Sequence, residues 1–324
     1  MSMKFLLVDI GKTKTVSAVV GEELELLGLG FSGPADVILE EEVIVQNLSR
    51  SHRSALESAQ LDLDDLDLIV LSWAGLDTRE QHTRAKEIAE RVGLPADKTH
   101  IIHDALAALY AVTLGRPGVA VIAGTGAIAI GLDAEGRTTR SSGWGWLIGD
   151  EGSGAWIALQ ALNSASRAYD GRGPWTSLVK RISDYFGVHD LLEIIDKIYL
   201  DVSKGDISKV AGISRIVDEE AQRGDEISRA ILVRAGKELA LSAVTVADRL
   251  GLEAPVVGEV GSVFKSRTVW EAYLLELKEK IPNAIVKEPY VGSQALVGCL
   301  VYAMIKSGRE VGESLVERLR MRLP

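Results

Sequence analysis

The chain has 324 residues, a net charge of −10 and one cysteine, with 47% hydrophobic and 25% charged residues. This length exceeds one compact core, so two domains are expected, and the ordinary composition argues against disorder. The negative charge argues against nucleic acid as the main partner, and the single Cys299 excludes a disulfide or cysteine-ligated metal within one chain. No run approaches the roughly 20 apolar residues of a membrane span. We therefore expect a cytoplasmic protein without membrane contact.

Short apolar runs and helical patterns alternate in an order that occurs twice. In the first half, strands and helices are expected in the order βββαβαβα, near 4–9, 14–20, 24–29, 39–60, 67–72, 78–93, 99–102 and 104–115. In the second half, strands are expected near 118–123, 127–132, 137–140, 255–260 and 284–287. A helix is expected from about 153, and another follows each of the last two strands. The repeat predicts an α/β protein with two domains of the same topology.

The domain boundary is expected at the Gly-Arg-Pro-Gly stretch 115–118, where glycine and proline punctuate the restart of the pattern. The predicted domains are 1–116 and 117–302, with a C-terminal segment, 303–324, that packs back on the first domain. That segment includes a helix expected at about 310–322. A helical insertion at about 174–250 enlarges the second domain, with helix stops expected at Gly187, Gly205 and Gly224.

Two glycine-rich turns lie between short apolar strands, more than a hundred residues apart. The first reads Ile-Gly-Lys-Thr-Lys-Thr at 10–15, and the second reads Gly-Thr-Gly-Ala at 124–127. Glycines allow the backbone N–H groups to approach an anion, and a threonine hydroxyl adds a donor. Either turn alone is more typical of a plain hairpin than of a phosphate site. Together they indicate a nucleotide phosphate chain held by two turns.

Asp9 closes the strand that enters the first turn. A carboxylate beside phosphates is repelled unless a cation stands between them, and Mg²⁺ binds through carboxylate, water and phosphate oxygens. The alternative is a turn-forming aspartate that hydrogen-bonds the following backbone.

Asp104 follows a predicted strand and precedes a predicted helix. This position is typical of a helix N-cap, and it also faces the crevice where α/β sheets bind ligands. His103 precedes it, but the other histidines show no metal-ligand spacing.

The segment 141–154, Ser-Ser-Gly-Trp-Gly-Trp-Leu-Ile-Gly-Asp-Glu-Gly-Ser-Gly, is rich in glycine and holds two tryptophans. Glycines allow close approach of a ligand, a tryptophan offers an apolar face to a sugar ring, and Asp150 can accept hydrogen bonds from hydroxyls. The alternative is a tight loop with Ser153 as the cap of the next helix. A further glycine turn, at 258–266, follows a buried strand and could approach an adenine ring or a ribose.

With these motifs in order, the chain resembles the superfamily of sugar kinases, actin and heat-shock ATPases. Within it, the chain is similar to N-acetylglucosamine kinases and archaeal broad-specificity hexokinases of the BadF/BadG type. The likeness covers nearly the whole chain and is most specific at 143–153, 261–266 and 221–225. It implies two RNase H-like domains flanking an ATP and sugar cleft, closure of the domains over the substrates, and a homodimer.

The resemblance also implies roles for individual residues in a reaction that uses ATP and Mg²⁺. Thr13 would lie near the γ-phosphate and Asp9 near the metal. The two phosphate loops would comprise Gly11, Lys12, Thr13, Lys14, Gly124, Thr125 and Gly126. The adenosine pocket would comprise Ala211, Gly261, Ser262 and Ser266.

For the sugar, the resemblance implies that Asp104 is the general base that takes the proton of the 6-hydroxyl. The sugar would contact Asp36, Asp104, Gly143, Trp144, Gly145 and Asp150. The chain departs from relatives at Lys12, which replaces a glycine, and at Glu259-Val260, which separates glycines that are often adjacent. Asp36 replaces an asparagine, and Ala127-Ile128 replaces a Ser-Asn pair that helps hold the acetylated sugar.

The resulting prediction is ATP- and Mg²⁺-dependent phosphorylation of N-acetylglucosamine, glucosamine or glucose at the 6-hydroxyl. Within the same fold, an activator of a radical dehydratase would need four cysteines, and two chains with Cys299 alone supply two thiols. The third reading is an ATP-binding regulatory protein without kinase activity. Release of ADP that depends on sugar separates the kinase from the regulator.

Overall fold

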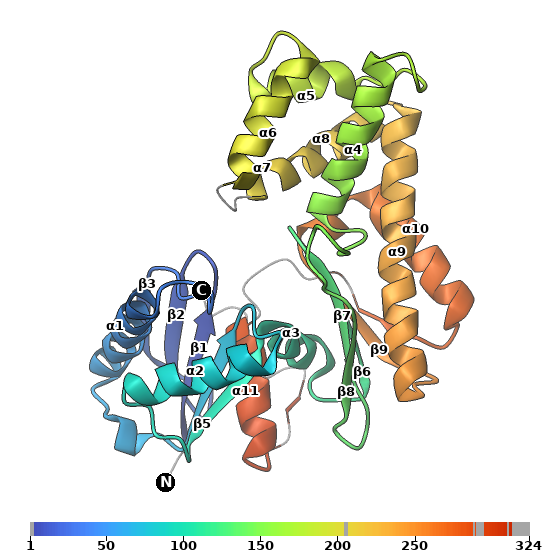
Figure 1. The fold of residues 1–324 in the computed structure, drawn as a ribbon. Helices are drawn as coiled ribbons and strands as arrows, with labels where there is room; N and C mark the ends of the chain where they lie inside the picture. The colour runs from blue at the N-terminus through green and yellow to red at the C-terminus, as the bar shows by residue number, and fades with distance from the viewer. Residues whose placement is uncertain (1–2, 204–206, 288, 290–294, 310, 313–324) are drawn as a thin grey trace. The chain divides into compact units, whose positions relative to one another are not determined.

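The computed structural model describes all residues except 1–2, 204–206, 288, 290–294, 310 and 313–324. The chain divides into two compact units (Figure 1). Unit 1 comprises residues 1–116 together with 292–324, and unit 2 comprises 117–291. No helix in the described part of the chain is both long and apolar enough to cross a membrane.

Unit 1 is built on a five-stranded mixed sheet with the order β3-β2-β1-β4-β5. The first three strands pair antiparallel, and β4 and β5 continue parallel to β1. The strands are β1 (Lys4–Ile10), β2 (Thr15–Gly21), β3 (Leu26–Ser32), β4 (Leu68–Trp73) and β5 (Thr99–His103). The strand expected from residue 24 begins at Leu26, because Leu24 adopts a left-handed backbone (φ 68°) in the hairpin turn.

Helices cover both faces of this sheet, as the alternation of side chains along β1 requires. Leu6 and Val8 face one apolar core, which also holds side chains of α1 and α2, whereas Phe5 and Leu7 face another, which holds side chains of α3 and α11. The helices of unit 1 are α1 (Glu41–Ala59), η1 (Leu63–Asp65), α2 (Arg79–Arg91), α3 (Asp104–Thr113) and α11 (Ala295–Lys306).

The expected end of the second domain at residue 302 is wrong, because unit 1 takes in residues from 292 onward. The physical reason is α11, whose fully buried Leu296 and Leu300 lie in the same core as Phe5 and Leu7. Burial of these apolar side chains stabilises the return of the chain to unit 1. The helix expected at 310–322 falls almost wholly outside the described residues.

Unit 2 repeats the topology of unit 1 on a second five-stranded sheet, with the order β10-β9-β6-β7-β8. Here β6, β7 and β8 pair antiparallel, and β9 and β10 run parallel to β6. The strands are β6 (Gly118–Ala123), β7 (Ala127–Leu132), β8 (Thr138–Ser142), β9 (Val256–Val260) and β10 (Ile285–Val286). The predicted duplication of an α/β unit is confirmed.

The predicted insertion is helical and lies between β8 and β9 (Figure 1). Its first helix, α5 (Leu178–Phe186), ends at Gly187 as expected, because that glycine adopts the left-handed backbone (φ 65°) of a helix C-cap. The expected stop at Gly205 lies outside the described residues. The helices of unit 2 are α4 (Gly154–Tyr169), α5 (Leu178–Phe186), η2 (Leu191–Glu193), α6 (Ile194–Ser203), α7 (Ser208–Ala211), α8 (Ile213–Gln222), α9 (Glu226–Leu250), η3 (Ser262–Lys265) and α10 (Arg267–Lys280).

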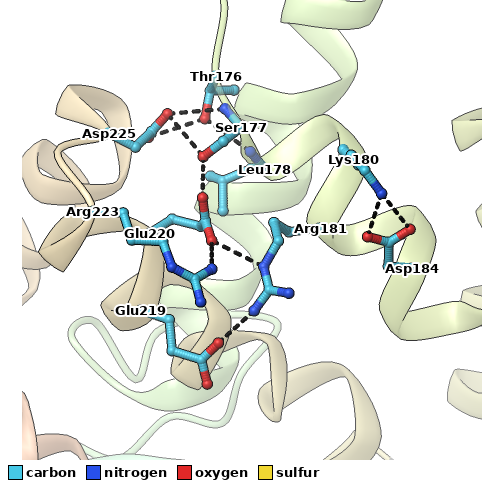
Figure 2. Close-up of polar contacts among 10 residues, drawn as sticks. All are labelled: Thr176, Ser177, Leu178, Lys180, Arg181, Asp184, Glu219, Glu220, Arg223 and Asp225. Atoms are coloured by element: carbon cyan, nitrogen blue, oxygen red, sulfur yellow. Dashed lines mark hydrogen bonds and ion pairs between the residues drawn. The ribbon is translucent and has the colours of Figure 1, made fainter.

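A polar network joins α5 to α8 and to the start of α9 (Figure 2). The Asp225 carboxylate accepts hydrogen bonds from Ser228 N (2.7 Å), from Thr176 Oγ1 (3.0 Å) and from Ser177 N (3.0 Å). Ser177 Oγ also donates to Glu220 Oε2 at 2.5 Å. Glu220, together with Asp225 at the end of the Ala-Gln-Arg-Gly-Asp stretch 221–225, therefore ties the end of α8 and the start of α9 to the start of α5.

We expect Gly298→Ala to destabilise unit 1, although alanine is the better helix former by up to about 1 kcal/mol. A Cβ at residue 298 of α11 would lie 1.8 Å from the carbonyl oxygen of Ala107 in α3, so the two helix backbones would have to separate. Such overpacking typically costs about 1–3 kcal/mol. Urea denaturation measures the effect, and an unchanged or raised free energy of unfolding would contradict this close helix contact.

Candidate nucleotide and sugar sites

The carboxyl ends of β1, β4 and β5 gather acidic side chains at one edge of the sheet of unit 1. Ile10 pairs with Trp73, and Trp73 pairs with His103, so the three strands end in register. Asp9 and Asp104 adjoin these end residues on β1 and β5. This edge is where open α/β sheets bind ligands.

The first glycine turn stands at the same edge. Gly11 N donates to Lys14 O at 3.0 Å and closes the turn, and the side chains between them, together with Lys14, are exposed. Ala35 N donates to Gly11 O at 3.3 Å. This bond ties the loop that carries Asp36 to the turn.

The carboxyl group of Asp9 is perturbed. Its pKa is raised from 3.8 to about 6, mainly because burial disfavours the charged form and also because of the charge of Asp104, whereas Lys14 lowers it. Two carboxylates that repel each other can be stabilised by a bound cation. The exposed lysines of the neighbouring turn can bind a phosphate. No cluster of three acidic, histidine or cysteine ligands occurs among the described residues.

Asp104 is the first residue of α3, but it is not the cap that we considered from the sequence. The N-cap is His103, whose Nδ1 lies 3.0 Å from Ala105 N and 2.8 Å from Asp104 Oδ1. Ala105 N also donates to Asp104 Oδ1 at 2.8 Å. The Asp104 side chain is 45% exposed. A half-exposed carboxylate oriented through one oxygen can accept a proton from a bound hydroxyl.

Asp36 lies in the loop between β3 and α1 and is 4% exposed. Its Oδ1 accepts a hydrogen bond from Ile38 N at 3.1 Å. Gly75 lies beside it with φ 80°, and a Cβ there would lie 3.4 Å from Asp36 Oδ1. The loops after β3 and β4 thus come together at the carboxyl edge of the sheet.

The second glycine turn joins β6 to β7 in unit 2. Gly124 N donates to Gly126 O at 2.9 Å, and the start of α4 closes on the turn through Ala155 N, which donates to Thr125 O at 3.1 Å. The Thr125 side chain is exposed. A Cβ on Gly126 would lie 2.6 Å from Asp150 Oδ2, so only glycine allows this carboxylate to approach the turn.

The glycine-rich loop presents apolar side chains to solvent. Gly145 N donates to Asp150 Oδ1 at 2.9 Å, and Asp150 is 7% exposed, so this carboxylate anchors the loop. Trp144 is 67% exposed, and Leu147 and Ile148 are also exposed. Ser153 caps α4 by accepting from Trp156 N at 3.1 Å, so the cap that we weighed for this loop is present as well.

A cavity of about 450 Å³ opens in unit 2 beside the second turn. This volume lies in the usual range of small-molecule sites. Its lining includes five residues expected from the sequence, namely Gly124, Thr125, Ala211, Ser262 and Ser266. Gly261 is not among the lining residues, but it shapes the turn. It has φ 112°, and a Cβ there would lie 2.3 Å from Ala123 O.

Sequence reasoning missed the polar side chains that the insertion contributes to this cavity. The wall also holds Arg215 and Asp218 of α8 and Lys265 of η3. Arg215 and Asp218 are three residues apart in α8, which places them on one face of that helix. That spacing was the available signal.

The two sheets of equal topology, with glycine turns at their strand ends, define an α/β ATPase fold of the actin and hexokinase class. The chain belongs to the BadF/BadG/BcrA/BcrD ATPase family, whose sequence profile matches residues 8–303.

Curated relatives include an N-acetylmuramic acid/N-acetylglucosamine kinase of Clostridium acetobutylicum, which is 32% identical over 78% of this chain and 82% of its own. An N-acetyl-D-glucosamine kinase of Dictyostelium discoideum is 33% identical over 67% of this chain and 69% of its own. Among solved structures, a Chromobacterium violaceum protein proposed to be an N-acetylglucosamine kinase superposes with a TM-score of 0.71. It is 21% identical over 92% of this chain and 98% of its own, a likeness that shows the fold.

Proposed function

We propose that this protein transfers the γ-phosphoryl group of ATP to the 6-hydroxyl of an amino sugar or hexose. The observation that carries the proposal is the half-exposed Asp104 carboxylate at the sheet edge that also holds the first glycine turn. The names of the curated relatives support a sugar substrate.

In this proposal each glycine turn is a phosphate-binding loop of its own unit. The cavity of unit 2 takes the adenosine, since an apolar wall of Ile157, Leu232 and Val269 meets a polar rim there. The exposed Thr125 and Thr13 hydroxyls donate to the phosphates, and Lys12 and Lys14 offset their charge.

Asp104 acts as the general base. It accepts the hydroxyl proton as the sugar oxygen forms its bond to the γ-phosphorus, and the bond to the β–γ bridging oxygen breaks to release ADP. His103 and Ala105 orient the carboxylate.

The residues present fit a magnesium ion at Asp9. Burial and, after it, the charge of Asp104 raise the pKa of Asp9, and a divalent cation beside Asp9 would stabilise its charged form against both. When bound, Mg²⁺ would neutralise charge on the transferred phosphoryl group. Asp9 would hold this ion.

The sugar is bound by residues that offer hydrogen-bond acceptors and an apolar face. Asp36 and Asp104 supply carboxylates. The exposed Trp144 supplies a ring, and Gly143 and Gly145 on either side of it have positive φ angles. Asp150 supports this loop and can accept from a sugar hydroxyl.

We expect glucose, glucosamine and N-acetylglucosamine all to be phosphorylated, with kcat/KM values within about two to three decades of one another. Ala127 and Ile128 offer no polar side-chain atoms, and Ile128 packs on the backbone of Gly143. An apolar wall discriminates by about 10–200-fold. The Asp36 carboxylate accepts from any hydroxyl or ammonium but cannot donate to an acetyl carbonyl.

A coupled assay of ADP release tests this with each sugar in turn, with mannose and N-acetylmuramic acid added to the panel. Asp36→Asn is the matched variant, because an amide regains a donor, and it should shift the preference toward the acetylated sugar. A preference of wild type for N-acetylglucosamine over glucose above about 10⁴ would contradict the apolar wall. ADP release without dependence on any sugar would contradict the proposed function itself.

A further inference from the structure

Ser266 lies at the wall of the unit 2 cavity and is held by a carboxylate on another element. The residue is 7% exposed and caps α10, accepting from Val269 N at 3.4 Å. Its hydroxyl also hydrogen-bonds Asp218 Oδ1 of α8, and Asp218 lines the same cavity. No part of the proposed phosphoryl transfer uses Asp218.

The direction of this hydrogen bond is fixed by the two groups. A carboxylate has no hydrogen to donate, so the Ser266 hydroxyl must donate to Asp218. A hydroxyl carries one hydrogen and two lone pairs. Val269 N–H uses one lone pair, so the remaining capacity of Ser266 is that of an acceptor.

Asp218 is itself held in place. Its Oδ2 accepts from Gln222 Nε2 at 2.8 Å, one turn further along α8. Two residues beyond Asp218, Glu220 is anchored by Ser177 Oγ at 2.5 Å and by the ion pair with Arg181 at 2.9 Å (Figure 2). The helix that carries Asp218 is therefore fixed from its opposite side, and the carboxylate is presented to Ser266 without rearrangement.

We propose that Asp218 is a positioning residue that fixes Ser266 as a hydrogen-bond acceptor, so that this wall selects a nucleotide group carrying a hydrogen. The inference rests on the proposed binding of ATP in this cavity. An adenine amine and a ribose hydroxyl both supply such a group. A carbonyl at the same place would face the lone pair of Ser266 and lose its own partner.

The test is calorimetric binding of four nucleotides to the full chain without sugar: ATP, inosine triphosphate, 2′-deoxy-ATP and 3′-deoxy-ATP. Inosine triphosphate replaces the amine with a carbonyl, and each deoxy analogue removes one ribose hydroxyl. Wild type should bind at least one analogue about 10-fold or more weakly than ATP. The analogue that is rejected identifies the group that Ser266 accepts from.

In Asp218→Ala the Ser266 hydroxyl is free to rotate and to donate. If inosine triphosphate is the rejected analogue, the ratio of its Kd to that of ATP should then fall toward one, because the freed hydroxyl can donate to the carbonyl and inosine triphosphate binds more tightly. If a deoxy analogue is rejected, the ratio should fall because ATP binds more weakly once the acceptor is no longer held in position. Asp184→Ala is the matched control, because Asp184 pairs with exposed Lys180 away from the cavity, and its ratio should remain that of wild type.

A purely structural role for Asp218 would weaken all four nucleotides by the same factor, and this result would overturn the proposal. Equal binding of all four by wild type would overturn it too. If Asp218→Ala does not fold, Ser266→Ala is the test. It removes the acceptor hydroxyl, so it must also abolish the difference in Kd between ATP and the rejected analogue. Wild type that binds no ATP refutes the proposed function, whereas binding without discrimination refutes this inference alone.

Discussion

Replacing Asp104 with asparagine is expected to lower kcat about 10²–10⁴-fold at saturating sugar and ATP, because the amide cannot take the hydroxyl proton. The fold should survive. Asparagine keeps an oxygen that can accept from Ala105 N, and the N-cap of α3 is His103 rather than Asp104. Steady-state kinetics with circular dichroism melting separate the chemical effect from a structural one.

Asp62→Asn is the matched control for this substitution. Asp62 also stands at the start of a helical turn of unit 1, at the N-cap of η1, but it is exposed and lies far from β5 in sequence. Its kcat should stay within about twofold of wild type. If Asp104→Asn kept a near-normal kcat while the melting temperature fell, Asp104 would be a structural residue of α3 and not the base.

Much of the fold could be predicted because its signals are local. Period-two apolar runs set the strands, and the glycine turns set the hairpins after β1 and β6. Asp104 was expected at the end of a strand, facing the crevice where α/β sheets bind ligands. The register of β1, β4 and β5 shows that these strands end together, so Asp104 lies at the same edge as Asp9.

Other features depend on tertiary contacts that no local pattern reports. The insertion was predicted as helical, but nothing in its periodicity said that Asp218 would meet Ser266 across forty-eight residues of sequence. The chain's return to unit 1 was expected at 303, whereas α11 begins at Ala295. The two differ because apolar periodicity shows that a helix is buried but not which sheet it packs against. His103 was weighed as a metal ligand, and its role as the cap of α3 depends on the backbone of Ala105.

Glu259 is the clearest conflict between local sequence and environment. It stands in β9 with its side chain wholly buried near the Tyr273 hydroxyl, and within the described part of the chain neither carboxylate oxygen makes a hydrogen bond of good geometry. Burial raises the pKa of Glu259 to about 8, although the Tyr273 hydroxyl lies near enough to lower it somewhat. The protein at neutral pH therefore carries Glu259 mainly as a neutral acid.

The stability of the protein should consequently fall as the pH rises toward 8. Between the unfolded pKa of 4.5 and the folded value of about 8, the folded chain holds a proton on Glu259 that the unfolded chain has released. One such proton gives a slope of about −1.4 kcal/mol per pH unit in the free energy of unfolding. Burial lowers the pKa of His52 to about 4, and this gives the opposite slope up to about pH 6.5. The loss due to Glu259 should therefore be plainest between about pH 6.5 and 8.

Glu259→Gln isolates the contribution of Glu259 to the pH dependence of stability, because glutamine has a similar shape and stays neutral at every pH. The free energy of unfolding of the variant should rise relative to that of wild type by about 1.4 kcal/mol per pH unit across that window. Urea denaturation at several pH values measures this difference. Glu253→Gln, the same change at an exposed position before β9, should follow wild type. Parallel curves for wild type and Glu259→Gln would mean that Glu259 is already ionised in the core, and its charge would then need a partner that the folded chain supplies.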